Sequence, residues 1–591
     1  MLCSLCRPAR RIVQQAAKLH THPTVVPPSS RVPPEHLRHP AFRETEDNLA
    51  SLPLFPTRGR EHVKVLYEPR EFYETLLDRI KHAKRRIFIA SLYVGKEEIE
   101  LVTALHAALR QNPSLRLTLL VDYLRSTREL PNASSASLLG TLAAAFPAQV
   151  DLRLFHTPAL NGWQKRWVPK RFNEGWGLQH MKVYGVDEDV ILSGANLSHD
   201  YFTNRTDRYL LFRNHSPLAD YFSSLVSLIS RVSFRATATD TTSTNNPALT
   251  ISWPEDNLIR QNPFDTPRTS IPALRDAAHD ALETLTRTWQ RKAPRELASS
   301  LPPFPSSPKS ASFPPSPGAN NPRAPFLSHF DTSLRPVLQM GPFSITQETD
   351  LVVPEIFRAA NALATAPGGG NTTLDWTSGY FGLREDYKRL VLECRAGVRI
   401  VSASPEANGF FNSRGVSRFI PPAYTYFAKR FYAEVVEEAK RRKNGEKHVH
   451  MREWKREGWT YHAKGIWLAP SVSNPYSPPA ADPSTSFSHH APPTDPSDDD
   501  IALSHRYSHP SPPFLTLLGS SNYGGRSATR DLEATLLLTT HDPGLRWDLE
   551  TEVRKIREWA VDDVDERLFE REGREVPLGV RIAARAIETM L

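Results

Sequence analysis

One short pattern occurs in two distant parts of this chain. The stretch GLQHMKVYGV places His180 and Lys182 two residues apart, and the stretch WTYHAKGIWLA places His462 and Lys464 at the same spacing. Both stretches have the composition of strands, and side chains two apart on a strand point to the same face. Each pattern therefore predicts an imidazole and an ammonium group that face one pocket.

The match continues beyond the two patterns. Asn196 follows the first in the sequence SGAN, and Ser520 and Asn522 follow the second in GSSN. Asp207 comes eleven residues after the first asparagine, and Glu533 comes eleven residues after the second. Chance is a poor explanation for four matched features, so the sequence predicts an internal duplication of a domain-sized unit.

The two carboxylates indicate how the rings are held. A carboxylate on one ring nitrogen of a histidine fixes the tautomer and leaves the other nitrogen for chemistry. From the equal spacing we predict that Asp207 hydrogen-bonds His180 and that Glu533 hydrogen-bonds His462. The alternative is that both carboxylates only pair with arginines close to them in the sequence.

Strand-like and helix-like segments alternate around both patterns, which predicts an α/β fold. In the first copy we predict strands at 85–95, 115–123 and 150–156 and helices at 97–111 and 218–232. In the second copy TLDWTSGYFGLREDYKRLVLE (373–393) repeats the strand, turn and helix of 86–106, and GVRIVSASP (397–405) is a further strand.

Composition sets the expected domain boundaries. A chain of 591 residues is too long for one ordinary core. Two regions, 294–325 and 471–513, hold ten of its 51 prolines each and favour no packed structure. We predict five segments: a leader at 1–40, a first domain at 45–235, a Pro/Ser/Thr-rich linker at 236–329 with a helix at 271–292, a second domain at 330–591, and a low-complexity insertion in it at 471–513.

The first 34 residues contain no Asp or Glu but five Lys and Arg residues, and RRIVQQAAKLH has the pattern of a short amphipathic helix. This composition is typical of a mitochondrial transit peptide. The alternative is a basic tail without that role. The chain has no run of 18 or more apolar residues, so any association with a membrane is expected to be peripheral.

Net charge and cysteine content narrow the classes of function. A formal charge of +8 favours anionic partners such as phospholipid surfaces, nucleotides or nucleic acids. Three cysteines provide neither a disulfide framework nor a zinc site, which fits a reducing compartment.

The pattern H-x-K-x4-D followed by G-S-x-N, present twice, resembles the phospholipase D superfamily. Asp187 completes the first copy, whereas Ala469 stands at the corresponding position of the second. The resemblance implies two duplicated α/β/α sandwich domains, related by a pseudo-twofold axis, with one active site between them. The sequences NEGWGLQHMK, SGANLSHDYFTNRTDRY, YHAKGIW and LGSSNYGGRS further resemble the phosphatidylglycerophosphate synthases of eukaryotic mitochondria.

The resemblance also implies roles for the matched residues. His180 is expected to attack phosphorus and form a phosphohistidine, and His462 is expected to act as general acid and then base, although spacing alone does not decide between them. Lysines and asparagines would hold the phosphate oxygens. The expected site comprises the catalytic residues His180, Lys182, Asp187, His462 and Lys464, the substrate-binding residues Asn196, Ser520 and Asn522, and the orienting residues Asp207 and Glu533. In the family the motif Asp is mainly structural.

The implied donor is CDP-diacylglycerol, the acceptor is sn-glycerol 3-phosphate, and the products are phosphatidylglycerophosphate and CMP. No metal or other cofactor is implied, and no nucleic acid partner is expected. The implied location is the mitochondrion, peripherally on the matrix side of the inner membrane and against an anionic surface.

Weaker candidates lie outside the repeated motifs. Arg125 and Arg128 follow the end of a predicted strand, where ligands of α/β folds usually bind, and would hold the acceptor phosphate. The alternative is a solvated loop. The segment 439–459 mixes basic residues with tryptophans and would rest on an anionic leaflet, or else forms a solvated charged face.

Two other functions use the same sequence features. Another phosphodiesterase of the superfamily, a lipid hydrolase or nuclease, would use the same histidines with water as acceptor. An inactive member would serve as a membrane scaffold, but all four His and Lys residues of the patterns are present.

Overall fold

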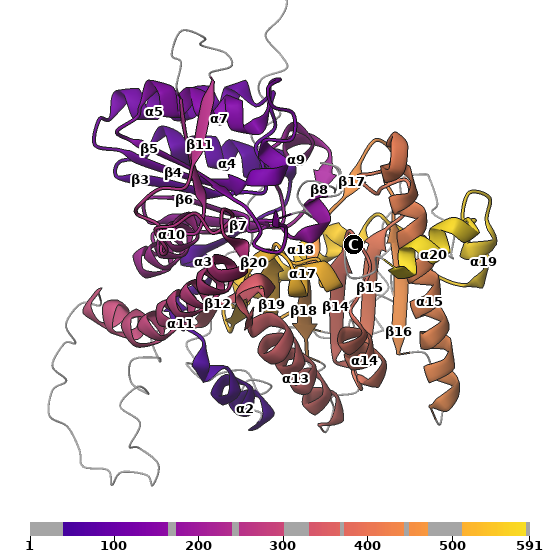
Figure 1. Ribbon diagram of the computed structural model, residues 1–591. Coiled ribbons are helices and arrows are strands. Elements are labelled where there is room, and N and C mark those ends of the chain that lie inside the picture. The colour runs from indigo at the N-terminus through magenta and orange to yellow at the C-terminus, as the bar shows by residue number, and fades with distance from the viewer. Residues whose placement is uncertain are drawn as a thin grey trace, which may run out of the picture.

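The computed structural model describes residues 40–162, 173–238, 248–300, 330–366, 371–442, 448–470 and 511–586. It contains two large mixed sheets, each flanked by helices, from the first and second halves of the chain (Figure 1). Residues 1–39 of the predicted leader, residues 471–510 of the predicted insertion and residues 301–329 lie outside the described residues.

The first sheet has the strand order β11-β10-β5-β4-β3-β6-β7-β9-β2. Its strands are β2 (Val63–Leu66), β3 (Arg86–Ala90), β4 (Arg116–Asp122), β5 (Val150–Phe155), β6 (Val183–Val186), β7 (Asp189–Ser193), β9 (Tyr209–Phe212), β10 (Phe234–Ala238) and β11 (Leu249–Ser252).

The second sheet has the order β1-β12-β20-β19-β18-β14-β15-β16-β21, with β13 beside β12. Its strands are β1 (Phe55–Thr57), β12 (Thr332–Met340), β13 (Ile345–Thr346), β14 (Thr373–Ser378), β15 (Gly397–Ala403), β16 (Val449–Trp454), β18 (Lys464–Ala469), β19 (Leu515–Gly519), β20 (Leu532–Thr540) and β21 (Ala560–Asp563).

The two sheets repeat one topology. The order β5-β4-β3-β6-β7-β9-β2 of the first corresponds strand by strand to β16-β15-β14-β18-β19-β20-β12 of the second. In both, three parallel strands are followed by antiparallel ones. The predicted duplication is therefore confirmed, and the segment 373–393 occupies the place of 86–106 as expected.

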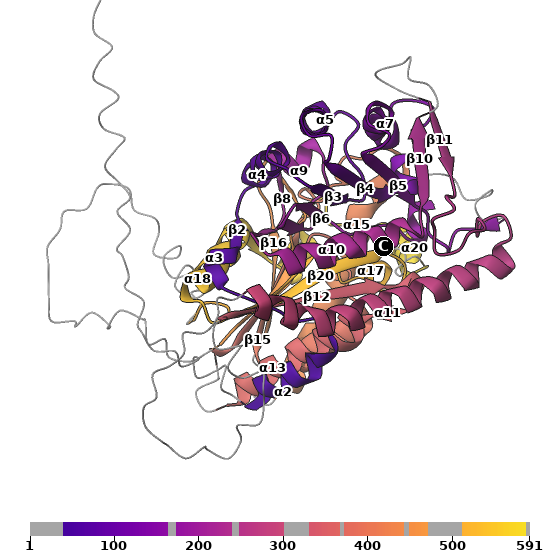
Figure 2. The ribbon, with the colours of Figure 1, turned by 90° about the vertical axis from the view of Figure 1, so that its left-hand side faces the viewer.

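Helices cover both faces of each sheet, as in the predicted α/β/α sandwich. The outer face of the first sheet carries α4, α5, α7 and α9, and its other face carries α10 (Figure 2). The first-half helices are α3 (Gly59–His62), α4 (Pro69–Lys81), α5 (Ile99–Gln111), α6 (Tyr123–Ser126), α7 (Ser135–Ala145), α9 (His199–Thr203) and α10 (Ser216–Ser230).

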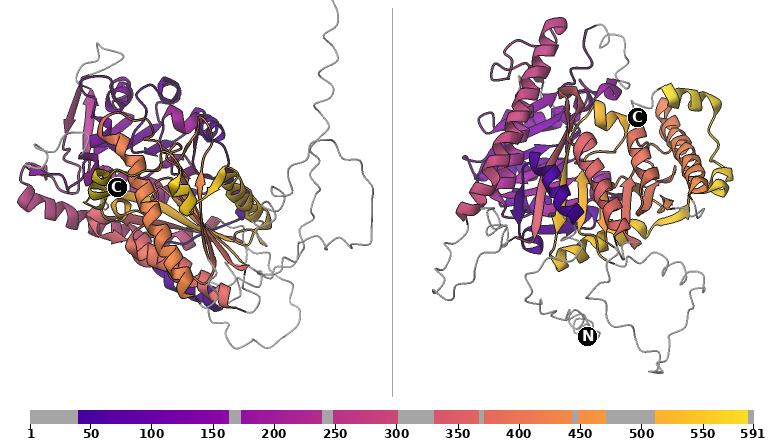
Figure 3. Two further views of the ribbon diagram at one scale, coloured as in Figure 1. Left: turned by 90° about the vertical axis from the view of Figure 1, so that its right-hand side faces the viewer. Right: turned by 90° about the horizontal axis from the view of Figure 1, so that it is seen from below.

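In the second half α13, α14 and α15 cover one face, and α18 lies on the face toward the first half (Figure 3). The remaining helices are α2 (Pro40–Asn48), α11 (Pro267–Ser300), α13 (Val353–Thr365), α14 (Glu385–Glu393), α15 (Ile420–Arg441), α17 (Gly525–Thr529), α18 (Pro543–Arg557), α19 (Glu566–Glu570) and α20 (Leu578–Ala586).

Local sequence explains where these helices begin. The Ser134 hydroxyl accepts the N–H of Ser137 at 3.1 Å, and the Ser137 hydroxyl accepts the N–H of Ser134 at 2.9 Å, which together cap α7. Asp542 caps α18 through the N–H of Leu545 at 2.7 Å, with Pro543 at the first helical position.

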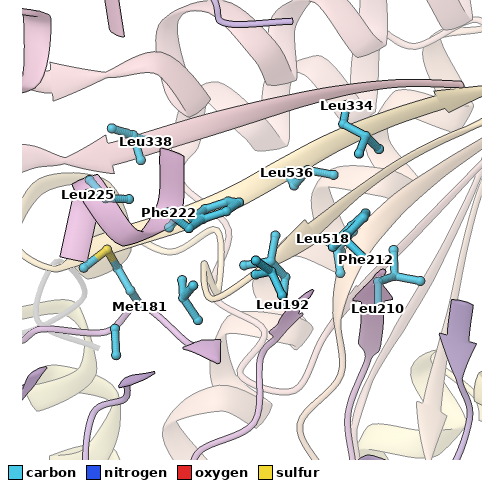
Figure 4. Packing of buried hydrophobic residues seen from close by; sticks show 14 of the residues in the cluster. Met181, Leu192, Leu210, Phe212, Phe222, Leu225, Leu334, Leu338, Leu518 and Leu536 are labelled. Carbon is cyan, nitrogen blue, oxygen red and sulfur yellow. The ribbon is translucent and has the colours of Figure 1, made fainter. Parts of the chain in front are cut away.

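A shared hydrophobic core joins the two halves. Met181, Leu192 and Phe212 of the first half and Leu338 and Leu536 of the second belong to one buried cluster (Figure 4). Burial of apolar surface stabilises by about 25 cal/mol per Å². Association of the halves is therefore part of folding, and it fixes the residues at their boundary.

The predicted start of the first domain at residue 45 is wrong. Strand β1 pairs with β12 of the second sheet, and α2 packs against α13 (Figure 2). The segment before β2 therefore belongs to the second half, although it is close in sequence to the first.

The predicted linker 236–329 is also wrong over much of its length. Strand β11 pairs with β10 at the edge of the first sheet, and α11 contributes buried Leu274, Leu282 and Trp289 to the shared core. The helix predicted at 271–292 is confirmed as part of α11. Polar composition concealed this packing because the buried residues form only one face of the helix.

Candidate active site

The two histidines meet the opposite half of the chain through their backbones. The N–H of His180 donates to the carbonyl of Leu532 at 3.0 Å, and the N–H of His462 donates to the carbonyl of Thr206 at 2.8 Å. The second contact continues a short ladder of β17 (Thr460–Tyr461) with β8 (Arg205–Thr206). Each histidine thus lies beside the residue that precedes the matched carboxylate of the other half.

The predicted pairing of carboxylates is wrong, because it is exchanged between the halves. The Nδ1 of His180 lies 2.9 Å from Oε1 of Glu533, and the Nδ1 of His462 lies 2.6 Å from Oδ2 of Asp207. All four side chains are buried. Each ring can donate Nδ1–H to a carboxylate, which leaves Nε2 as the reactive nitrogen of both histidines.

The two lysines have matching contacts. Lys182 Nζ donates to the carbonyl of His180 and Lys464 Nζ to the carbonyl of His462, each at 2.6 Å. Lys464 Nζ also lies 3.5 Å from Oδ2 of Asp207 and 2.8 Å from Nδ1 of His462. The predicted proximity of each His and Lys pair is confirmed, although both histidines lie just before a strand rather than in one.

Burial controls the protonation of these groups. Burial and the neighbouring Lys182 ammonium hold the pKa of His180 well below its usual value, and burial and Lys464 do the same for the pKa of His462. Burial lowers the pKa of Lys182 to about 7 and raises the pKa of Glu533 to about 6. The neutral imidazole that burial favours is the form in which His180 can attack phosphorus.

The motif asparagines are both buried at this boundary. Asn196 donates Nδ2–H to the hydroxyl of Tyr201 at 3.1 Å. Within the part of the chain that the structure describes, Oδ1 of Asn196 and Oδ1 of Asn522 have no hydrogen-bond partner. Ser520 exchanges hydrogen bonds with the backbone of Ala534, next to Glu533.

The departure from G-S-x-N in the first copy has a steric reason. Gly194 stands where the second copy has Ser520, and a Cβ at Gly194 would lie 2.4 Å from Oδ1 of Asp207 and 2.7 Å from Nζ of Lys464. A side chain there would displace the groups that hold His462.

Asp187 is not part of this site, so its inclusion among the catalytic residues is wrong. It occupies the turn between β6 and β7 with a φ of 52°, and its carboxylate accepts the backbone N–H groups of Lys84, Arg85 and Arg86 at 2.8–3.1 Å. It fixes the turn before β3. Ala469 of the second copy is the last residue of β18.

The two weaker candidates of the first half have protein partners. Arg125 lies over the ring of Tyr93 at 4.3 Å, and Arg128 donates to Glu174 at 2.8 Å. Both are partly exposed. A role in binding phosphate stays a prediction, and for Arg128 it requires exchange of Glu174 for the ligand.

The site contains aromatic residues that motif reasoning missed. The hydroxyl of Tyr201 lies 3.3 Å from Nε2 of His462, and the ring of Tyr380 lies 5.4 Å from the His462 ring. Arg205 stacks on Tyr201 at 4.6 Å. Tyr93 and Tyr380 occupy the same position in the repeated turns S-x-Y-x-G and S-G-Y-F-G, and this was the available signal.

One group of possible metal ligands lies within the site. Among the described residues, His180, Asp531 and Glu533 offer ligand atoms within 4.8 Å of one another. These atoms already have partners: Glu533 bonds His180, and Asp531 accepts from Arg526 Nε and from the N–H of Leu178, each at 2.9 Å. We interpret the cluster as a hydrogen-bonded support for His180.

The segment 439–459 is less suited to a membrane than its composition indicated. Trp454 is buried and stacks on Tyr461 at 5.0 Å, while Arg456 lies over the ring of Trp459 at 3.9 Å. Within the described segments, no helix combines the length and hydrophobicity needed to cross a bilayer.

Curated relatives decide the family. The chain is 35% identical to the CDP-diacylglycerol–glycerol-3-phosphate 3-phosphatidyltransferase of Schizosaccharomyces pombe over 508 residues, 84% of this chain and 89% of the relative. The chain belongs to the CDP-diacylglycerol–glycerol-3-phosphate 3-phosphatidyltransferase family. The Saccharomyces cerevisiae member is 34% identical over 88% of this chain and 87% of its own, and the Gallus gallus member, named mitochondrial, is 35% identical over 89% and 83%.

Solved structures support the fold of this phosphatidyltransferase family member. The phosphatidylserine synthase of Haemophilus influenzae matches 93% of this chain and 99% of its own, with a TM-score of 0.55 and 18% identity. At that identity the likeness concerns the fold alone, and it agrees with paired phospholipase D-like domains. No family model matches the sequence.

Proposed function

We propose that this protein transfers the phosphatidyl group of CDP-diacylglycerol to sn-glycerol 3-phosphate, giving phosphatidylglycerophosphate and CMP. The observation that carries the proposal is the pair of buried histidines, one from each half, whose Nδ1 atoms each bond a carboxylate of the other half. The relatives that share most of the chain's length carry this activity in their names.

The first step is a displacement at phosphorus. Nε2 of His180 attacks the phosphatidyl phosphorus, the bond to the CMP oxygen breaks, and His462, protonated and paired with Asp207 at this stage, gives its Nε2 proton to that oxygen. Glu533 stabilises the positive charge that develops on the His180 ring. Because Glu533 bonds Nδ1, the ring can attack only through Nε2.

The second step reverses the roles around the same phosphorus. His462 removes the proton from a glycerol 3-phosphate hydroxyl, the oxygen attacks, and the bond to His180 breaks. Lys182 and Lys464 stabilise the negative charge on the phosphate oxygens in both steps. A half-turn of the Asn196 or Asn522 amide places an N–H donor where Oδ1 now has no partner among the described residues.

The test is release of CMP from CDP-diacylglycerol by the purified protein, with and without glycerol 3-phosphate. We expect release beyond one CMP per protein to require the acceptor and to yield labelled phosphatidylglycerophosphate. Continued release at the same rate in its absence would identify a hydrolase. His180→Ala and His462→Ala serve as inactive controls, each expected to lose more than about tenfold in rate, or about 1.4 kcal/mol of barrier.

We further propose that the protein works in the mitochondrion, as a peripheral protein on the matrix side of the inner membrane. Support comes from the mitochondrial names of vertebrate relatives and from the basic composition of residues 1–34. A fusion of residues 1–40 to a fluorescent protein should enter mitochondria. Cytosolic fluorescence would contradict the proposed leader.

A further inference from the structure

Large apolar side chains are exposed around the first turns of α15. They are Phe411 in the loop before this helix, Val416 and Phe419 in the 3-10 helix Gly415–Phe419 that leads into it, and Leu578 and Ile582 on α20; we call this set the apolar rim. Their exposed fractions run from 39% for Phe419 to 70% for Leu578. Single exposed apolar side chains are common on protein surfaces, but a group of large ones in one region is unusual.

Helix α20 is amphipathic and is held in place by one face. Val580 and Ala584 of α20, together with Val576 just before the helix, pack against Ala423 and Phe427 of α15. The positions between them leave Leu578 and Ile582 exposed, so the outer stripe of α20 is apolar as well. Figure 1 shows α20 beside the upper part of α15.

The two segments that carry the apolar rim hold charges of one sign. Residues 407–433 contain two lysine or arginine pairs, Arg414 with Arg418 and Lys429 with Arg430, and no Asp or Glu. Residues 576–587 likewise contain two arginines and no acidic residue. Apolar side chains surrounded by basic ones are complementary to an anionic lipid surface.

The apolar rim is connected to the candidate site by direct contacts. The carbonyl of Ala407, where the loop begins, accepts the N–H of Tyr461, next to His462, at 2.8 Å. The ring of Tyr380 lies 5.4 Å from that of His462 and 5.9 Å from that of Phe410. A surface bound at the apolar rim therefore lies beside the edge of the site that holds His462.

We propose that the apolar rim, with the arginines around it, docks this enzyme on an anionic phospholipid bilayer. The proposal rests on the proposed function, since a diacylglycerol donor resides in a membrane. Docking here brings the bilayer surface to the His462 edge of the site, so that the donor's phosphates enter the protein while its acyl chains stay in the lipid.

Vesicle sedimentation of the full-length protein, without substrate, tests the docking surface directly. On phosphatidylcholine vesicles with about one third phosphatidylserine, the triple variant Phe411→Ser, Leu578→Ser, Ile582→Ser should bind at least about tenfold more weakly than the wild type. The matched control, Trp547→Ser with Val561→Ser, removes side chains of 47% and 60% exposure elsewhere and should bind normally. Equal binding by the triple variant would overturn the proposal.

A second variant tests how much the basic residues contribute to vesicle binding. Arg414→Gln with Arg418→Gln should weaken binding about fivefold per arginine on anionic vesicles, with little change on pure phosphatidylcholine. Equal losses on both lipids would contradict charge complementarity.

Activity separates this proposal from the proposed function. With a short-chain, water-soluble CDP-diacylglycerol the triple variant should keep wild-type turnover. With a vesicle-borne donor the variant should turn over more slowly than the wild type. A wild type that is inactive on both donors would refute the proposed function. Equal turnover by the wild type and the triple variant on both donors would refute docking. If the wild type is a dimer, the triple variant is a monomer and vesicle binding is unchanged, the apolar rim is a contact with a second copy of the chain instead.

Discussion

Asp207 and Glu533 hold histidines that belong to the other half of the chain, at 2.6 and 2.9 Å. The equal spacing in the two copies correctly placed a carboxylate beside each ring. It did not decide between pairing within a copy and pairing across copies, because both give the same spacing. Backbone contacts made only after the halves associate decide the partner.

Substitution of these carboxylates should slow chemistry more than binding. Asp207→Asn and Glu533→Gln keep the size of each side chain but present a donor or a neutral acceptor to Nδ1, which disturbs the tautomer. We expect turnover to fall about 100-fold or more with KM nearly unchanged. Steady-state kinetics of CMP release measure both; a loss confined to KM would place the carboxylates in substrate binding.

Burial of the Lys182 ammonium group lowers the stability of the folded protein, so its replacement by an apolar residue should raise stability while it removes activity. The folded pKa of Lys182 is lowered to about 7, whereas the unfolded value is about 10.5, so between these pH values the unfolded chain binds the additional proton. Wild-type stability therefore rises with pH across this window. We expect Lys182→Met to be inactive but more stable at pH 7, with its advantage shrinking toward pH 10. Thermal unfolding at several pH values measures this difference, and an advantage that grows with pH would contradict the assigned pKa.

At the scale of elements, a buried ion pair joins Arg208, the residue before strand β9, to the helix α18. Arg208 donates to Glu552 through Nε at 2.9 Å and Nη2 at 2.8 Å, and its guanidinium lies 3.7 Å from the ring of Trp467. This arginine directly follows Asp207. The same contact therefore joins the halves and positions the Asp207 carboxylate, which bonds His462.

Removal of one partner of this ion pair should lower the free energy of unfolding much more than replacement of both partners by apolar residues. Arg208→Ala leaves Glu552 buried without its partner, and we expect a loss of about 3–5 kcal/mol. Arg208→Met combined with Glu552→Leu should recover much of that loss. Urea unfolding of the three proteins provides the comparison, and a double variant as unstable as Arg208→Ala would contradict this reading.

Strands and helices with a clear hydrophobic period were predictable from the sequence. The segments 97–111 and 218–232 became α5 and α10 with small shifts at their ends. The pairing of β10 with β11 was not predicted, because both strands are short and half-exposed. Such edge strands are stabilised by tertiary pairing, which leaves little trace in local composition.

For the whole molecule, residues 40–57 complete the second half rather than the first. Buried Arg335 of β12 donates to Glu46 at 2.7 Å and to the carbonyl of Leu49 at 3.1 Å. A chain that begins at residue 58 loses these partners and the edge strand β1. It should have a markedly lower melting temperature than a chain that begins at residue 40, as followed by circular dichroism. Equal melting temperatures would show that this segment adds nothing to stability.

The duplication and its motifs allowed the sequence to predict one site between two halves. The order of the chain did not reveal which half β1 joins, because no local pattern records a contact made with β12 far along the sequence. The same limit applied to the crossed carboxylates. In both cases the missing information was a long-range contact.

The central claim, a shared site with one nucleophilic histidine, has a direct test. The protein is mixed with CDP-diacylglycerol carrying ³²P at the phosphatidyl phosphorus, without glycerol 3-phosphate, and quenched rapidly. We predict an alkali-stable, acid-labile label on the peptide containing His180 that is absent from His180→Ala and moves to phosphatidylglycerophosphate when the acceptor is added. A label that persists in His180→Ala, or CMP release without any labelled protein or acceptor requirement, would contradict the account.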